Sequence, residues 1–83
     1  MKVIRISALW CMSCMIMYER TQALQEEFGI DFIDLDIDQD DVSNYNIERT
    51  LPVLIFLDEK GEEKGRLIGE ISKKKLKKYM EAL

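Results

Sequence analysis

Two cysteines, the only ones in this 83-residue chain, lie two residues apart in Trp10-Cys11-Met12-Ser13-Cys14. At this spacing the two sulfur atoms can form a disulfide or share a soft metal ion. The chain contains no histidine, so no imidazole is available to activate either thiol. Backbone N–H groups, a helix dipole or a nearby Lys or Arg must therefore stabilise any thiolate.

The residues on either side of the cysteine pair predict a strand followed by a helix. Lys2–Ser7 is rich in β-branched apolar residues, and apolar residues after Cys14 recur at helical spacing as far as Phe28. Gly29 is placed to end a helix over Cys11–Phe28 in the left-handed conformation. A cysteine at the start of this helix meets the free N–H groups of the first turn, which favour its thiolate form.

Three further strands are predicted downstream. Apolar and acidic residues alternate over Ile30–Ile37, as in a strand with one polar face. Five apolar residues follow Pro52 and predict a strand buried on both faces within Thr50–Leu57. Turn residues at 58–61 then predict that Lys64–Ile68 returns antiparallel to it.

Two more helices complete the predicted order. A weak apolar pattern over Asp40–Ile47 suggests a short helix, and Ser72 is placed to cap a final helix that runs to Leu83. Strand, helix and strand at the start of the chain form a parallel βαβ unit. We therefore expect one α/β domain over residues 1–83, with a four-stranded mixed sheet in the order β-α-β-α-β-β-α and helices on both faces.

Composition restricts the class of protein. The chain is 47% hydrophobic and 34% charged, as in an ordinary globular domain. No apolar stretch approaches the roughly 18 residues of a membrane span, and the first ten residues do not form a signal peptide. We expect a cytoplasmic monomer with no cofactor and no membrane partner. In that compartment a cysteine pair is more often catalytic or metal-binding than structural.

Charge is unevenly distributed along the chain. The net charge is −4, yet residues 19–63 carry 14 acidic and three basic side chains, while residues 64–83 carry seven basic and two acidic ones. The acidic balance argues against nucleic acid as a partner. Five lysines crowd the final predicted helix, at positions 73, 74, 75, 77 and 78. They form either a solvated helix face, the favoured interpretation, or a docking patch for an acidic partner protein.

These motifs and their order resemble the thioredoxin superfamily in its minimal, glutaredoxin-sized form. The family's Trp-Cys-x-x-Cys matches Trp10 to Cys14, its proline before an apolar strand matches Pro52, and its glycine after the last strand matches Gly69. The resemblance implies a thioredoxin-like fold and a thiol–disulfide oxidoreductase that reduces protein disulfides. It also implies a cis peptide bond between Leu51 and Pro52.

The resemblance assigns a role to each candidate residue. It implies that Cys11 is the nucleophile and that Cys14 is the resolving cysteine, which releases the reduced substrate. The implied substrate-binding residues are Trp10, Met12, Ser13, Leu51, Pro52 and Gly69. The expected partners are protein disulfides and a reductase or thiol donor that restores the dithiol.

The chain departs from the family pattern at two positions. Met12-Ser13 replaces the usual Gly-Pro between the cysteines, and Arg5 stands where thioredoxins carry a buried acidic residue.

Two other functions remain open. The pair could bind copper(I) or another soft metal as a chaperone does, with Met12 and Met15 as thioether ligands. The domain could also be a redox-inert binding module that keeps the fold.

Overall fold

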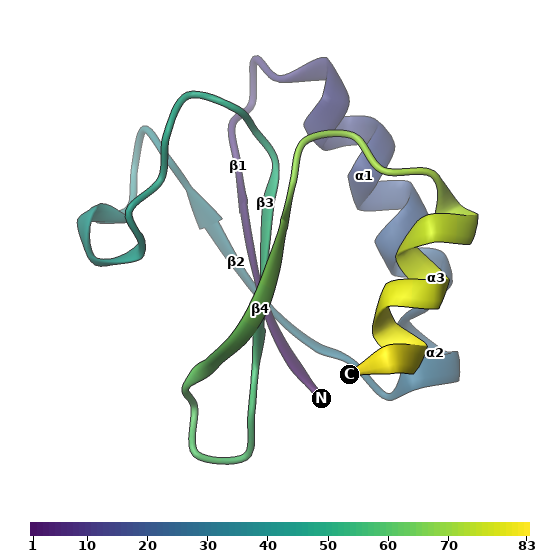
Figure 1. Ribbon diagram of the computed structural model, residues 1–83. Coiled ribbons are helices and arrows are strands. Elements are labelled where there is room, and N and C mark those ends of the chain that lie inside the picture. Colours follow the sequence, from purple (N-terminus) through teal and green to yellow (C-terminus); the bar gives the residue numbers. More distant parts are fainter.

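A four-stranded sheet with the strand order β2-β1-β3-β4 forms the centre of the protein in a computed structural model that describes residues 1–83 (Figure 1). The strands are β1 (Lys2–Ser7), β2 (Asp31–Asp36), β3 (Val53–Leu57) and β4 (Glu63–Ile68). The helices are α1 (Met12–Ala23), α2 (Gln25–Phe28) and α3 (Lys73–Ala82). β1 pairs parallel with β2 and antiparallel with β3, which pairs antiparallel with β4. The predicted mixed sheet is confirmed.

One face of the sheet is covered by α1 and α3, which lie on the same side of it (Figure 1). The apolar stripes of both helices pack on the side chains of β1 and β3 that point to this side. This buried cluster contains Val3, Met17, Leu24, Ile30, Leu54, Phe56, Leu76 and Met80. Burying each such side chain contributes roughly 1.5–3 kcal/mol, so the cluster fixes α1, and with it the cysteine pair, against the sheet.

The opposite face is covered by the segment between β2 and β3, which contains no α-helix. Its only regular element is η1 (Ser43–Tyr45), a single 3-10 turn. The apolar residues of this segment and of neighbouring strands pack on a second buried cluster: Ile4, Ile6, Ala8, Cys11, Cys14, Leu51, Val53 and Ile55. The helix predicted over Asp40–Ile47 on this face is therefore a single 3-10 turn and not an α-helix.

Local hydrogen bonds explain why residues 40–47 do not form an α-helix. The backbone N–H and the hydroxyl of Ser43 both donate to the carboxylate of Asp41, and these bonds lower the pKa of Asp41. Asn46 then adopts the left-handed conformation, with φ of 53°, and ends the turn. Asp, Ser and Asn side chains bond readily to nearby backbone, which favours turns over helices.

Arg66 joins this segment to the edge strand β4. Its Nη1 donates to the carbonyl oxygen of Tyr45 at 2.8 Å, and its Nη2 donates to Glu63 at 2.6 Å. The hydrogen bond from Arg66 lowers the pKa of the Glu63 carboxyl. The 3-10 turn is thus held over the sheet by a side chain from β4, in addition to its own apolar contacts.

The helix predicted over Cys11–Phe28 is interrupted at Leu24. The N–H of Leu24 bonds to the carbonyl of Thr21, three residues back, and α2 begins after it. The Leu24 side chain is only 2% exposed, so the interruption keeps it in the core. Gly29 ends α2 with φ of 58°, as predicted. None of the helices is long and apolar enough to cross a membrane.

Truncation of Leu76 should test how far α3 stabilises the helix-covered layer. Leu76 is fully buried, and we expect Leu76→Ala to lower the free energy of unfolding by about 2–5 kcal/mol, because it removes apolar contacts and leaves a cavity. Urea denaturation measures this loss. Leu83→Ala, at a position 38% exposed, is the control and should cost less than about 1 kcal/mol. Equal losses in both variants would contradict the packing described here.

Candidate active site

Cys11 lies at the N-terminus of α1, where the chain leaves β1 and enters the helix. It is the N-cap residue, with φ of −97° and ψ of 110°, and its sulfur accepts a hydrogen bond from the N–H of Cys14 at 3.2 Å. The sequence predicted this position at a strand-to-helix junction. A sulfur at a helix N-terminus is exposed to unpaired N–H groups and to the positive end of the helix dipole, which both favour a thiolate.

Cys11 and Cys14 are joined by a disulfide. Both residues are buried, with 9% of Cys11 and 6% of Cys14 exposed. Their neighbours Trp10 and Met12 are 68% and 73% exposed. The two cysteines therefore differ little in exposure in the disulfide form. The position of Cys11 at the N-terminus of α1 distinguishes it more clearly from Cys14.

The pairing of β1 with β3 brings a distant segment to the cysteines. Ile6 lies opposite Val53, so Pro52, which precedes Val53, lies at the end of the sheet where β1 leads into the cysteine loop. Leu51 packs in the same buried cluster as both cysteines. The peptide bond between Leu51 and Pro52 is cis.

Gly69 holds the loop after β4 against this segment. Its N–H donates to the carbonyl of Pro52 at 2.8 Å, and its φ is 85°. A side chain at this φ would be strained, and a Cβ would lie 3.4 Å from Thr50. The structure therefore places Gly69 next to Pro52, through its backbone.

A hydrogen bond that the sequence did not reveal fixes Trp10. The indole Nε1 donates to the carboxylate of Asp38 at 2.8 Å. Asp38 follows β2, at the same end of the sheet as the cysteines, because β2 runs parallel to β1. In the sequence, Asp38 is one of several acidic residues in a row, and no local pattern distinguishes it from the others.

Arg5 is buried beneath α1 and is directed away from the sulfurs. Only 4% of the residue is exposed. Its Nη2 bonds to Asp34 at 2.9 Å, and its Nη1 bonds to Thr21 at 2.9 Å and to Gln22 at 3.3 Å. The guanidinium, which could have faced the cysteines, is therefore engaged by β2 and by the middle of α1.

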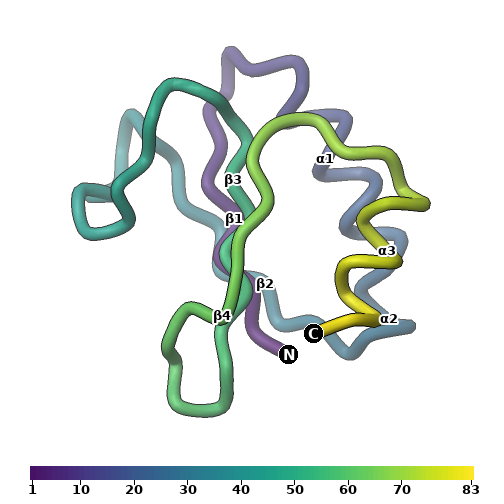
Figure 2. Tube along the Cα trace, in the orientation of Figure 1, coloured from purple at the N-terminus to yellow at the C-terminus, as the bar shows by residue number.

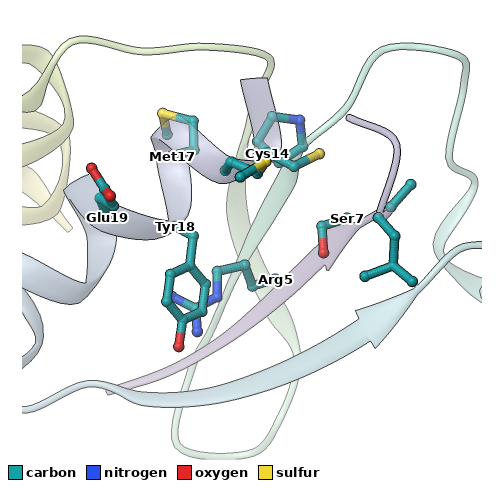
Figure 3. A pocket seen from close by; sticks show the side chains of 10 residues that line it. Arg5, Ser7, Cys14, Met17, Tyr18 and Glu19 are labelled. Atoms are coloured by element: carbon teal, nitrogen blue, oxygen red, sulfur yellow. The ribbon is translucent and has the colours of Figure 1, made fainter. Parts of the chain in front are cut away.

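Two aromatic rings enclose the same guanidinium. The Arg5 Cζ atom lies 4.3 Å from the centre of the Tyr18 ring and 3.9 Å from that of Phe32, and Figure 3 shows Tyr18 stacked over it. Cation–π contact adds to the ion pair with Asp34. Arg5 thus forms a structural anchor at the position where thioredoxins carry an acidic residue.

A cavity of about 410 Å³ lies beside Cys14 (Figure 3). Its walls come from the end of β1, the first turns of α1 and Pro52, and most of the lining residues are apolar. Ser7 and the edge of Arg5 also line it. The cavity therefore opens beside Cys14, and neither Trp10 nor Met12 lines it.

Exposed apolar side chains extend the site along the outer face of α1. Leu9 is 83% exposed, Met15 61%, Tyr18 50% and Ile16 38%. Helical periodicity gave no reason to expect so many apolar residues on the solvent side. Together with Trp10 and Met12 they form an apolar rim around the cysteine pair, suited to contact with another protein. No group of three or more His, Cys, Asp or Glu residues lies close enough together to hold a metal ion.

The ion pair between Arg5 and Asp34 generates a prediction on stability. Asp34→Asn leaves the buried guanidinium without its counter-charge, and we expect a loss of about 1–3 kcal/mol in the free energy of unfolding. The double variant Arg5→Met/Asp34→Asn removes the unpaired charge as well and should recover at least half of that loss. Urea denaturation of the wild type, Asp34→Asn, Arg5→Met and the double variant measures the coupling energy; simply additive losses would show that the pair is not coupled.

The contact between Trp10 and Asp38 generates a second prediction. Trp10 is the only tryptophan, so its fluorescence anisotropy reports the mobility of this side chain alone. Asp38→Ala removes the hydrogen-bond acceptor and should lower the anisotropy, because the exposed ring then rotates more freely. Asp31→Ala, at the far end of β2, is the matched control and should leave it unchanged. Unchanged anisotropy in Asp38→Ala would show that this bond does not hold the ring.

A family model and two curated relatives all relate this chain to thioredoxins. Residues 1–82 match the thioredoxin family model. The thiol:disulfide interchange protein TxlA of Synechococcus elongatus is 34% identical over 80 residues, covering 89% of this chain and 41% of that protein. Thioredoxin X of Arabidopsis thaliana, a chloroplastic protein, is 28% identical, covering 98% of this chain and 47% of its own length. The chain thus spans less than half the length of these two relatives.

Solved structures agree with this fold. Oxidised mitochondrial thioredoxin 3 of Saccharomyces cerevisiae superposes with a TM-score of 0.82 at 24% identity, covering 99% of this chain and 77% of the other. Oxidised thioredoxin O2 of Arabidopsis thaliana gives a TM-score of 0.81 at 26% identity, covering 99% and 73%. With a family model that matches nearly its whole length and a cysteine pair at the start of α1, the chain belongs to the thioredoxin family.

Proposed function

We propose that this chain is a thiol–disulfide oxidoreductase that reduces protein disulfides by cycling Cys11 and Cys14 between dithiol and disulfide. The observation that carries the proposal is the position of Cys11, whose sulfur caps α1 and accepts the N–H of Cys14. The family match and the disulfide between the two residues support it. Residues 1–83 act as a single thioredoxin-like domain in this proposal.

Cys11 is the nucleophile of the proposed reaction. Its thiolate, stabilised at the helix N-terminus, attacks one sulfur of a substrate disulfide and forms a mixed disulfide. The other substrate sulfur leaves as a thiolate and takes a proton from solvent. Because the chain has no histidine, this step depends on backbone N–H groups for activation.

Cys14 resolves the mixed disulfide. It loses its proton, attacks the sulfur of Cys11 and forms the disulfide Cys11–Cys14, while the substrate sulfur bonded to Cys11 leaves as a second thiolate and is protonated. The cavity beside Cys14 gives solvent a path for the proton. In sum, the protein dithiol is oxidised and the substrate disulfide is reduced to two thiols, a transfer of two electrons.

The segment before β3 provides a backbone edge for the substrate. Neither the N–H nor the C=O of Leu51 has a hydrogen-bond partner, and an extended peptide could pair with both groups. Pro52 places this edge beside the sulfurs, and Gly69 holds Pro52 in place. Trp10, Met12 and Ser13 contact the substrate from the other side of the cysteine pair.

The proposal also covers the partners, the oligomeric state and the compartment of the protein. The partners are protein disulfides and a thiol donor or reductase that returns two electrons to the Cys11–Cys14 disulfide. The protein works as a monomer in the cytoplasm, without a cofactor, and does not act on nucleic acid or membranes. The acidic net charge supports the exclusion of nucleic acid.

Substitution of each cysteine should separate the two roles. With dithiothreitol as electron donor, the wild type should reduce insulin disulfides, and Cys11→Ser should abolish the reaction because it removes the attacking thiolate. Cys14→Ser should lose turnover and, when the reduced protein is freed of dithiothreitol and mixed with insulin, should accumulate a mixed disulfide through Cys11, since no second thiol is present to resolve it. Turbidity of reduced insulin measures turnover, and mass spectrometry under non-reducing conditions identifies the trapped species.

Two results would contradict this proposal. Wild-type protein that gives no turnover above dithiothreitol alone would exclude the reductase activity. A mixed disulfide that forms in Cys11→Ser but not in Cys14→Ser would reverse the two roles. Glu59→Ala serves as the control, because Glu59 is exposed in the turn between β3 and β4, outside the proposed site, and it should retain turnover within about threefold of the wild type, a difference of less than 1 kcal/mol.

A further inference from the structure

Four lysines on α3 form a charged patch that the redox site does not use. We define the basic patch as Lys73, Lys74, Lys75 and Lys78, all of them exposed. None of the four makes an ion pair, whereas the fifth lysine of the helix, Lys77, pairs with Glu27 at 3.1 Å. The patch therefore presents four uncompensated positive charges to solvent.

The arrangement of these lysines disfavours the helix that carries them. Lys73, Lys74 and Lys75 form the first turn of α3, which contains no acidic residue. The positive end of the helix dipole lies there and repels them, at a typical cost of about 0.3–1 kcal/mol for each charge. Lys74 and Lys78 are also like charges four residues apart on one face, which is unfavourable as well. Helix stability gives no reason for this pattern, and local rules are most often broken where function requires it.

The basic patch lies close to the proposed active site. Gly69 bonds to the carbonyl of Pro52, and only three residues separate Gly69 from Lys73, so the two lie at most about 14 Å apart. The intervening segment runs beside α1 (Figure 2), where Arg20 donates to the carbonyl of Ile71 at 2.8 Å. A partner whose disulfide reaches Cys11 can therefore extend over the first turn of α3.

Nearby acidic groups do not neutralise the basic patch. Glu70, in the same segment, lies 3.7 Å from Arg20, so its charge is directed to α1. Glu27 is paired with Lys77. Much of the remaining negative charge lies on β2, the edge of the sheet opposite β4, and in the segment that follows it (Figure 1). The protein thus carries one positive surface on an otherwise acidic chain.

We propose that the basic patch docks acidic protein substrates, so that disulfides flanked by Asp and Glu are reduced in preference to others. This rests on the proposed reductase function and adds a substrate class to it. Complementary charge at the edge of an interface mainly raises the rate of association and suppresses wrong partners. The substrate is therefore a protein with carboxylates close to its disulfide, and the patch orients it before Cys11 attacks.

An acidic protein fits the patch better than an anionic membrane does. The apolar stripe of α3, which includes Leu76 and Met80, is buried in the core. The exposed face of α3 thus has lysines but no large apolar side chain to insert among lipids, as interfacial helices do. Binding to anionic vesicles is kept as an alternative outcome of the test.

Matched peptides test the proposal directly. Each is a synthetic peptide with one intramolecular disulfide, flanked by four Asp, four Asn or four Lys residues, with dithiothreitol as electron donor. At low ionic strength we expect kcat/KM to be about tenfold higher for the Asp peptide than for the Asn peptide, and lowest for the Lys peptide. This preference should fall to less than twofold at 1 M salt, where the Debye length is about 3 Å.

Two triple variants of equal net charge identify the surface responsible. Lys73→Glu/Lys74→Glu/Lys75→Glu should lose the preference for the Asp peptide and keep its rate with the Asn peptide. Lys2→Glu/Lys60→Glu/Lys64→Glu changes three exposed lysines outside α3 and should keep the preference. The first variant should also melt at a higher temperature than wild type, because glutamates favour the first turn of a helix; this excludes loss of fold as the cause.

The outcomes separate this proposal from the reductase function. No turnover of any peptide would contradict the reductase function. Equal turnover of the Asp and Asn peptides at low salt would overturn the docking proposal alone. An equal loss of preference in both triple variants would also overturn it, by showing that only net charge matters. Wild-type binding to vesicles of anionic phospholipid that the first triple variant abolishes, without a preference among peptides, would assign the patch to membranes instead.

Discussion

The position of β1 at the centre of the sheet is the constraint on which the rest of this structure depends. It pairs parallel with β2 on one side and antiparallel with β3 on the other. Both pairings lead to the same end of the sheet, where β1 enters the cysteine loop. Asp38 reaches Trp10 from the β2 side, and Pro52 reaches Cys14 from the β3 side. A shift of either strand by one residue would turn its side chains to the other face and dismantle this arrangement.

The chemistry of the site follows from a helix N-terminus without a nearby acid or base. Backbone N–H groups at Cys11 supply the stabilisation that a histidine or a carboxylate supplies in other thiol enzymes. At the position where thioredoxins carry a buried acidic residue, this chain has Arg5, whose charge is neutralised by Asp34 and covered by Tyr18 and Phe32. In the proposed reaction the proton that leaves Cys14 enters the cavity beside it, which is open to solvent and is also lined by Glu19.

The two faces of the sheet are covered differently, by α-helices on one side and by a 3-10 turn on the other. Helices α1 and α3 close one face around a continuous core; α1 begins at the cysteine pair and α3 carries the basic patch, while the two cysteines themselves pack in the cluster of the other face. The other face is covered by a 3-10 turn and by the contact of Arg66 with Tyr45. The redox site and the lysines are thus carried by neighbouring helices, and a partner protein can contact both at once.

The sequence by itself determined the elements and the reactive pair. Period-two and period-3.6 patterns located the strands and the helices that carry the cysteines, and Gly29, Pro52 and Ser72 marked boundaries because their backbone preferences are local. It did not determine contacts between distant segments. In the sequence Asp38 is one acidic residue among several, and only the fold brings it to Trp10. Likewise, only strand pairing brings Asp34 to Arg5. Residues 40–47 form a 3-10 turn instead of the predicted helix. These depend on strand pairing and on competition between side chain and backbone for hydrogen bonds, which only the tertiary structure decides.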